Sequence, residues 1–144
     1  MPATFKNTEI TDEFLRESPN AYFVFGDNAT RQGLGGAAKL RHNPKAIGFI
    51  TKKAPNNDPR AFFTVEEFIK PFFSQLDALR ELIKSNPQNV YYVSKLGAGL
   101  ANRHNIWEKL IGPNLVQDLE EFDNVVFCWD GPITALPQPQ QPEQ

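Results

Sequence analysis

Cysteine, long apolar runs and an excess of either charge are all scarce in this sequence of 144 residues. Its one cysteine, Cys128, can form neither an internal disulfide nor a cysteine-based zinc site, which is typical of a reducing compartment. No apolar run approaches the ~18 residues that a membrane-spanning helix needs, and the first residues lack the apolar stretch of a secretory signal. We therefore expect a cytoplasmic protein that makes no membrane contact.

The charge balance argues against a broadly basic surface. The chain has 15 Lys plus Arg against 17 Asp plus Glu, a net charge of −2, whereas a protein that binds nucleic acid over a wide surface normally has a basic excess. Residues 31–60 nevertheless contain a cluster of cations opposed only by Asp58, which we name the basic rim: Arg31, Lys39, Arg41, Lys45, Lys52, Lys53 and Arg60. The rim can attract anions to a pocket, or it can be a solvated face balanced by later acidic helices.

Side chains that bind metals are few. His42 and His104 are far apart in the chain and have no cysteine or carboxylate partner at ligand spacing. Cys128 falls within an apolar run, so we expect a buried and unreactive thiol. The sequence therefore predicts neither a metal site nor a cofactor.

Alternation of strands and helices predicts the fold class. Short apolar runs bounded by turn-forming residues predict buried strands at 22–25, 46–51, 90–94 and 124–129. Residues 4–20 resemble a short strand followed by a helix. We therefore expect an α/β fold with three layers, in which a mixed, mostly parallel sheet lies between helices. Residues 1–131 would form this single domain, and the Pro- and Gln-rich residues 132–144 a flexible tail.

Two helical regions carry capping signals. Thr64 and Glu67 have the spacing of a capping box ahead of an apolar stripe with helical periodicity, which Pro71 is expected to kink or to divide into two helices. Asn105 and Glu108 repeat this spacing before a second helical pattern. We expect residues 112–113, Gly-Pro, to interrupt that pattern before a further helix from 113 to about 121.

The first candidate binding segment follows the strand at 22–25. Asp27 and Asn28 come at its carboxyl end, and Gly33, Gly35 and Gly36 then lead into a strong helix former. We name residues 29–36 the first glycine loop. Glycines let the backbone approach a ligand, and a helix that begins there presents free N–H groups to an anion. The alternative is a glycine-rich turn that only reverses the chain.

The second candidate segment follows the strand at 90–94. Residues 94–103, the second glycine loop, place Gly97 and Gly99 on either side of Ala98, which suits a loop that wraps a pyrophosphate with its amides. Lys52 and Lys53 follow Thr51 at the end of another strand. Exposed lysines are usually solvated charges, but a lysine whose pKa is lowered by burial or by a neighbouring cation can act as a nucleophile.

These motifs resemble macro domains, the ADP-ribose-binding α/β modules. Residues 33–40, Gly-Leu-Gly-Gly-Ala-Ala-Lys-Leu, resemble the family's first loop, and residues 96–101, Leu-Gly-Ala-Gly-Leu-Ala, resemble its phosphate-wrapping loop. Residues 50–53, Ile-Thr-Lys-Lys, resemble the branch that removes ADP-ribose from glutamate or from DNA bases, in which the first lysine is catalytic. The ligand-binding residues that the resemblance implies are Asp27, Asn28, Gly33, Gly35, Gly36, Thr51, Gly97, Ala98, Gly99, Leu100, Ala101 and Asn102.

The resemblance implies that Asn28 and Asp27 face the distal ribose and that the two glycine loops hold the pyrophosphate. Lys52 would be the catalytic residue, with Asp27 as the accompanying carboxylate, because the lysine-using branch has an aspartate where this chain has Ala101 and Asn102. That departure favours binding of ADP-ribose or a related nucleotide over hydrolysis. The ligand could be attached to a protein or to a nucleic acid. The alternative function is a nucleic-acid-associated or host-interaction module that uses the basic rim.

Overall fold

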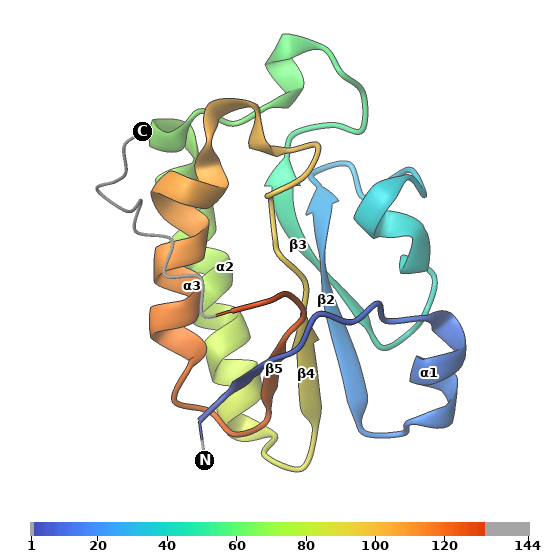
Figure 1. Cartoon of the computed structure of the whole chain (residues 1–144). Coiled ribbons are helices and arrows are strands. Elements are labelled where there is room, and N and C mark those ends of the chain that lie inside the picture. Colours follow the sequence, from blue (N-terminus) through green and yellow to red (C-terminus); the bar gives the residue numbers. More distant parts are fainter. Residues whose placement is uncertain (1, 132–144) are drawn as a thin grey trace.

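A five-stranded sheet forms the middle layer of the computed structural model, which describes residues 2–131 (Figure 1). The strand order is β1-β5-β4-β2-β3, and every pair of neighbouring strands is parallel. The strands are β1 (Thr4–Phe5), β2 (Ala21–Asn28), β3 (Ala46–Lys52), β4 (Val90–Val93) and β5 (Val125–Phe127). The predicted α/β class is confirmed. Among the described strands, however, the sheet is parallel throughout, because each chain crossing between strands carries helix or loop over a face of the sheet.

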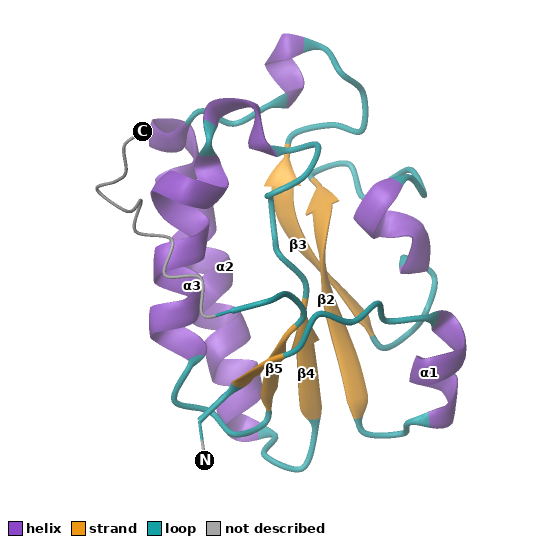
Figure 2. Ribbon diagram, viewed as in Figure 1, coloured by secondary structure: helices purple, strands orange, loops and turns teal. Residues whose placement is uncertain are grey.

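Helical segments cover both faces of the sheet (Figures 1 and 2). The helices α2 (Val65–Ser85) and α3 (Gly112–Leu119) cover one face, and α1 (Asp12–Glu17) with the short 3₁₀-helix η1 (Gly36–Leu40) covers the other. Each face has its own buried apolar cluster, the larger beneath α2 and α3 and the smaller beneath α1 and η1. The sheet is therefore the middle of three layers, as expected.

Helix α2 begins at the predicted capping box. The Glu67 N–H donates to Thr64 Oγ1 at 3.2 Å, and the Thr64 N–H donates to Glu67 Oε1 at 3.0 Å. Contrary to the predicted division, α2 continues through Pro71 as one element. The apolar stripe explains why the two halves stay aligned, since residues on both sides of Pro71 are buried in one core: Phe68, Phe72, Leu76, Leu79 and Ile83.

The helix that leads into α3 differs from the prediction in two ways. Asn105 has a left-handed φ of 59° and is not the cap; Asn102 Oδ1 accepts the Trp107 N–H at 2.9 Å. The Gly-Pro pair does not interrupt the helix either, because a π-helical turn, Trp107–Ile111, runs directly into α3. The Gly112 N–H bonds the Trp107 carbonyl five residues earlier, and Pro113, which has no N–H to donate, follows in the first turn of α3.

Strand β2 continues past its predicted end at residue 25 and includes Asp27 and Asn28. It pairs with β3 as far as Asn28 and Lys52, with a shift in register between Asp27 and Asn28. The proposed tail, residues 132–144, lies outside the described residues. Within 2–131, no helix is both long and apolar enough to cross a membrane, and no group of three or more His, Cys, Asp or Glu side chains could hold a metal ion.

Candidate functional site

A cavity of about 460 Å³ lies at the carboxyl end of the sheet, between the loops that follow β2 and β4. These two strands are neighbours, but their chains leave in opposite directions. The chain after β2 passes over the face of α1 through η1, and the chain after β4 passes over the opposite face through α3 (Figure 1). Parallel α/β sheets bind ligands in the crevice that opens at such a switch point.

The cavity gathers most of the site residues predicted from sequence. Those that line it are Asp27, Asn28, Gly33, Gly35, Gly36, Thr51, Lys52, Gly97, Gly99, Leu100 and Ala101. Ala98 and Asn102 do not line it: Ala98 packs against the larger core, and Asn102 caps the helix that follows. Sequence reasoning missed further lining residues: Gly26, Gln32, Ala38, Pro55, Ser94, Lys95 and Leu96. Gly26, Ser94 and Lys95 could have been found, since they stand where strands end.

The side chain of Asn28 forms hydrogen bonds to two residues of the first glycine loop. Its Nδ2 donates to the Gln32 carbonyl at 2.8 Å, and its Oδ1 accepts from the Thr30 N–H at 3.0 Å and from the Thr30 hydroxyl at 2.5 Å. The side chain is buried, and its amide oxygen and nitrogen are both occupied within the loop. In this arrangement Asn28 shapes the loop, whereas the resemblance implied a contact to the distal ribose.

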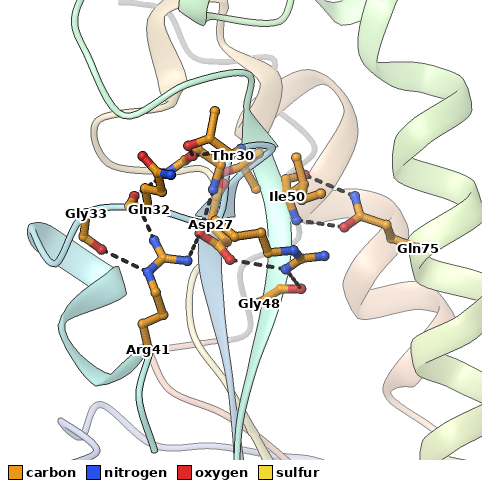
Figure 3. Close-up of polar contacts among 11 residues, drawn as sticks. Asp27, Thr30, Gln32, Gly33, Arg41, Gly48, Ile50 and Gln75 are labelled. Carbon is orange, nitrogen blue, oxygen red and sulfur yellow. Dashed lines mark hydrogen bonds and ion pairs between the residues drawn. The ribbon is translucent and has the colours of Figure 1, made fainter.

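Asp27 is held by two arginines (Figure 3). Arg31 Nη1 lies 3.1 Å from Asp27 Oδ2, and Arg41 Nη1 lies 2.6 Å from Oδ1. The Asn28 N–H also donates to Oδ1, at 2.8 Å. With both oxygens engaged and its side chain only 1% exposed, this carboxylate is poorly placed to take a proton from a ligand. The predicted catalytic role of Asp27 stays a prediction that this geometry does not favour.

Lys52 is a buried cation at the cavity wall. Its Nζ donates to the Asn56 carbonyl at 2.9 Å and lies 4.7 Å from the centre of the Phe62 ring. Within residues 2–131 no carboxylate forms an ion pair with it. Burial lowers the pKa of Lys52, because desolvation penalises the charged amine. The positive charge of Lys53 was expected to help lower the pKa of Lys52, but Lys53 Nζ is paired with Glu67 at 3.2 Å, and desolvation is the cause of the lowered pKa.

The second glycine loop depends on Gly97 for its shape. Gly97 has a φ of +76°, and a Cβ there would lie 2.6 Å from Ile111 Cδ1. Gly26 packs nearby, with its own hypothetical Cβ 3.8 Å from the Gly97 N. Gly99 has no positive φ and open space around it. The close packing is therefore at Gly97, while Gly99 faces free volume in the cavity wall.

Most of the basic rim is neutralised within the structure. The carboxylate partners are Glu9 for Lys39, Glu67 for Lys53, Asp58 for Arg60, and Asp27 for both Arg31 and Arg41. Lys45 instead donates to the carbonyls of Leu15 and Ser18. These contacts favour the interpretation of the rim as a balanced face over that of an open anion-binding surface.

Two cations at the cavity lack such a partner. Besides Lys52, the exposed residue Lys95 lines the cavity, and its Nζ lies 5.4 Å from the centre of the Trp107 ring. Neither lysine is paired with a carboxylate in the described part of the chain. Asp27, which also lines the cavity, has its negative charge balanced by Arg31 and Arg41. The positive charges of Lys52 and Lys95 therefore determine the net charge of the cavity wall.

A second cavity of about 300 Å³ adjoins the first, and the two share Gly36 and Ser94 in their walls. Its other walls combine the apolar side chains of Ile10, Phe23 and Leu40 and the thiol of Cys128 with the polar residues Thr8, Glu9 and Lys39. Burial raises the pKa of the Cys128 thiol to about 12, so this side chain stays protonated at neutral pH, in agreement with the expected unreactive thiol. Both cavities therefore have mixed polar and apolar walls, and the two lysines without a carboxylate partner in the described residues line the first.

Comparison with known proteins gives one match. The model of the Family of unknown function (DUF7831) matches residues 5–110, a range that includes both glycine loops. No curated protein and no solved structure matches the chain.

Proposed function

We propose that this chain, a member of the Family of unknown function (DUF7831), binds ADP-ribose or a related NAD-derived nucleotide in the cavity between its two glycine loops. The location and the lining of the cavity carry the proposal. The cavity lies at the switch point of a parallel sheet, glycine loops form two of its walls, and Lys52 and Lys95 supply uncompensated positive charge. Each of these features favours a phosphorylated ligand.

The volumes of the two cavities and the two lysines of the first support a ligand that has an anionic part and an apolar part. The cavities of about 460 Å³ and about 300 Å³ have volumes typical of small-molecule sites. A pyrophosphate carries negative charge that the two lysines can balance, and the glycine loops allow the backbone to approach it closely. A nucleobase is flat and largely apolar, and the adjoining cavity offers the apolar side chains of Ile10, Phe23 and Leu40 for it to pack against. A nucleotide with a sugar-pyrophosphate extension therefore has parts suited to both cavities.

The alternative of a nucleic-acid or host-interaction module receives little support. It requires the basic rim to present free cations, yet most of the rim's charges are paired with carboxylates. Binding of a long polyanion would have to break these pairs. We therefore retain the cavity, and not the rim, as the binding site.

Calorimetric titration of the full chain with ADP-ribose, AMP, NAD and ribose 5-phosphate tests the proposal. We expect ADP-ribose to bind most tightly, because only it combines the base, the pyrophosphate and a free second ribose without a positively charged ring. The proposal fails if none of the four compounds binds at millimolar concentration.

A matched pair of variants tests whether the cavity is the binding site. Gly99→Val places a branched side chain in open space at a position without positive φ, so the fold should persist. We expect ADP-ribose affinity to fall at least about tenfold, equivalent to ~1.4 kcal/mol. Gln88→Val adds the same side chain to an exposed turn before β4, at the opposite end of the sheet, and should leave affinity unchanged. Equal affinities of the two variants would remove the second glycine loop from the site.

A further inference from the structure

Arg41 touches the first glycine loop at several points without lining the cavity itself. Its Nε donates to the Gly33 carbonyl at 2.9 Å, and its Nη2 donates to the Gln32 carbonyl at 3.0 Å (Figure 3). Its Nη1 is buried and lies 2.6 Å from Asp27 Oδ1. The guanidinium thus joins the carboxyl end of β2 to two consecutive peptide groups of the loop.

These contacts determine which backbone groups the loop can offer to an anion. A carbonyl oxygen that faced the cavity would repel a phosphate. The carbonyls of Gln32 and Gly33 point instead to Arg41, behind the cavity wall, and Asn28 Nδ2 also binds the Gln32 carbonyl. Held on that side, these two carbonyls do not face the cavity.

The arrangement requires an arginine at this position. A guanidinium presents its nitrogens in a fixed planar fork; here two of them donate to carbonyls while the third forms an ion pair with a carboxylate. The donors of a lysine all start from one nitrogen, so they cannot take the positions of three separate guanidinium nitrogens. The side chain of Arg41 is 12% exposed, whereas that of Arg31, the other partner of Asp27, is 54% exposed, so Arg41 is the more enclosed of the two.

Gly48 on β3 leaves the space that this cluster needs. A Cβ at Gly48 would overlap Asp27 Oδ2 and lie 2.6 Å from Arg31 Nη1. The first glycine loop is therefore supported by one connected cluster of side chains, Asp27, Arg31 and Arg41. The absence of a side chain at Gly48 leaves room for this cluster.

We propose that Arg41 is a positioning residue for ligand binding: by holding the carbonyls of Gln32 and Gly33 behind the cavity wall, it keeps the first glycine loop in the form that accepts a phosphate. This inference rests on the proposed nucleotide-binding function. Arg41 acts through the loop and does not contact the ligand.

The test compares ADP-ribose binding by wild type, Arg41→Lys and Arg41→Ala, with Arg60→Ala as the control. The Arg60 side chain is 89% exposed and pairs with Asp58, so its removal should leave affinity unchanged. We expect Arg41→Lys to bind at least about tenfold more weakly, although it keeps the positive charge beside Asp27. Millimolar guanidinium should restore part of the affinity of Arg41→Ala by occupying the vacated space, whereas urea should not.

Amide hydrogen exchange gives a second measurement that needs no ligand. In Arg41→Lys, the amides of residues 33–36 should exchange several-fold faster than in wild type, while those of α2 stay unchanged. If Arg41→Ala does not fold, Arg41→Lys and Gly48→Ala carry the test, and Gly48→Ala should also weaken binding and speed exchange in the loop. Equal loop exchange and equal affinity in wild type and Arg41→Lys would overturn the inference. Absence of ADP-ribose binding by wild type would defeat the proposed function instead, and loop exchange would still decide the role of Arg41.

Discussion

Lys52 combines three properties that seldom occur together in a lysine. It is only 8% exposed, its Nζ bonds a backbone carbonyl, and it lies over the face of Phe62. The aromatic face and the carbonyl stabilise the ammonium, but neither neutralises its charge. Desolvation therefore dominates, and the pKa of Lys52 is lowered.

The lowered pKa of Lys52 predicts a pH dependence of stability. Below the folded-state pKa the amine is charged in both states, and the folded state bears the full desolvation cost. As pH rises from the folded-state pKa toward the unfolded value of about 10.4, the unfolded state binds more protons and stability rises. Lys52→Met removes this dependence. We expect urea unfolding to show wild type gaining stability relative to Lys52→Met as pH rises toward about pH 10; parallel curves for the two proteins would contradict this.

Substitution of Lys52 also separates an enzyme from a binding protein. If the neutral amine attacks the anomeric carbon, Lys52→Ala and Lys52→Arg should both lose turnover of ADP-ribosylated protein or DNA, since a guanidinium stays protonated and cannot attack. ADP-ribose affinity should then change only a few-fold.

If Lys52 only contacts phosphate, the substitutions should act on affinity, and arginine should be largely tolerated. A borohydride-trapped adduct at Lys52 would support the enzyme, whereas wild type without turnover on either substrate would support the binding protein. Ala101 and Asn102 stand where the lysine-using macro domains have an aspartate, so we expect the second outcome.

The second glycine loop contains two glycines with different physical roles. Gly97→Ala should destabilise the fold by about 2 to 4 kcal/mol, because a left-handed φ strains an alanine and its Cβ would overlap Ile111. Gly99→Ala, in open space and without positive φ, should change stability by less than about 0.5 kcal/mol. Thermal unfolding of the two variants measures the contrast, and equal melting temperatures would be the opposing result.

The start of the helix that leads into α3 depends on Asn102. Asn102→Ala removes the acceptor for the Trp107 N–H and the donor to Glu108 Oε1, and should cost about 1 kcal/mol. Asn105→Gly is the control, because the left-handed φ of 59° suits glycine; we expect a change within about 0.5 kcal/mol. Urea unfolding should show a larger loss of stability for Asn102→Ala than for Asn105→Gly. A larger loss of stability for Asn105→Gly would indicate that Asn105 is the cap.

For the whole molecule, the distribution of charge predicts how salt affects ligand binding. Buried cations are screened less than surface cations. Of the two lysines that line the cavity without a carboxylate partner in the described residues, Lys52 is buried and Lys95 is exposed. We expect the logarithm of ADP-ribose affinity to fall with the logarithm of salt concentration with a slope no steeper than about −2. Duplex DNA should compete poorly with ADP-ribose at physiological salt. A steeper slope together with tight DNA binding would support the alternative function, in which the basic rim binds nucleic acid.

Much of the molecule follows from local sequence spacing. The capping box at Thr64 and Glu67 and the apolar stripe of α2 both depend on residues three or four apart on one helix, so they are legible in the sequence. Alternation of apolar strands with helices indicated the three layers. Glycines directly after two strands indicated a site at the carboxyl edge of the sheet, because parallel neighbours bring those ends together.

Only the tertiary structure decided how individual side chains in that site are used. Asp27 and Asn28 looked available to a ligand, but Arg41, which is distant along the chain, and the loop that begins after Asn28 engage their polar atoms. Lys53 forms an ion pair with Glu67, and helix α2 continues through Pro71. The side chain that accepts the Trp107 N–H is that of Asn102 and not that of Asn105. Periodicity along a sequence determines which face of an element is apolar, whereas the partner of a given charge depends on contacts between segments that only the packed fold brings together.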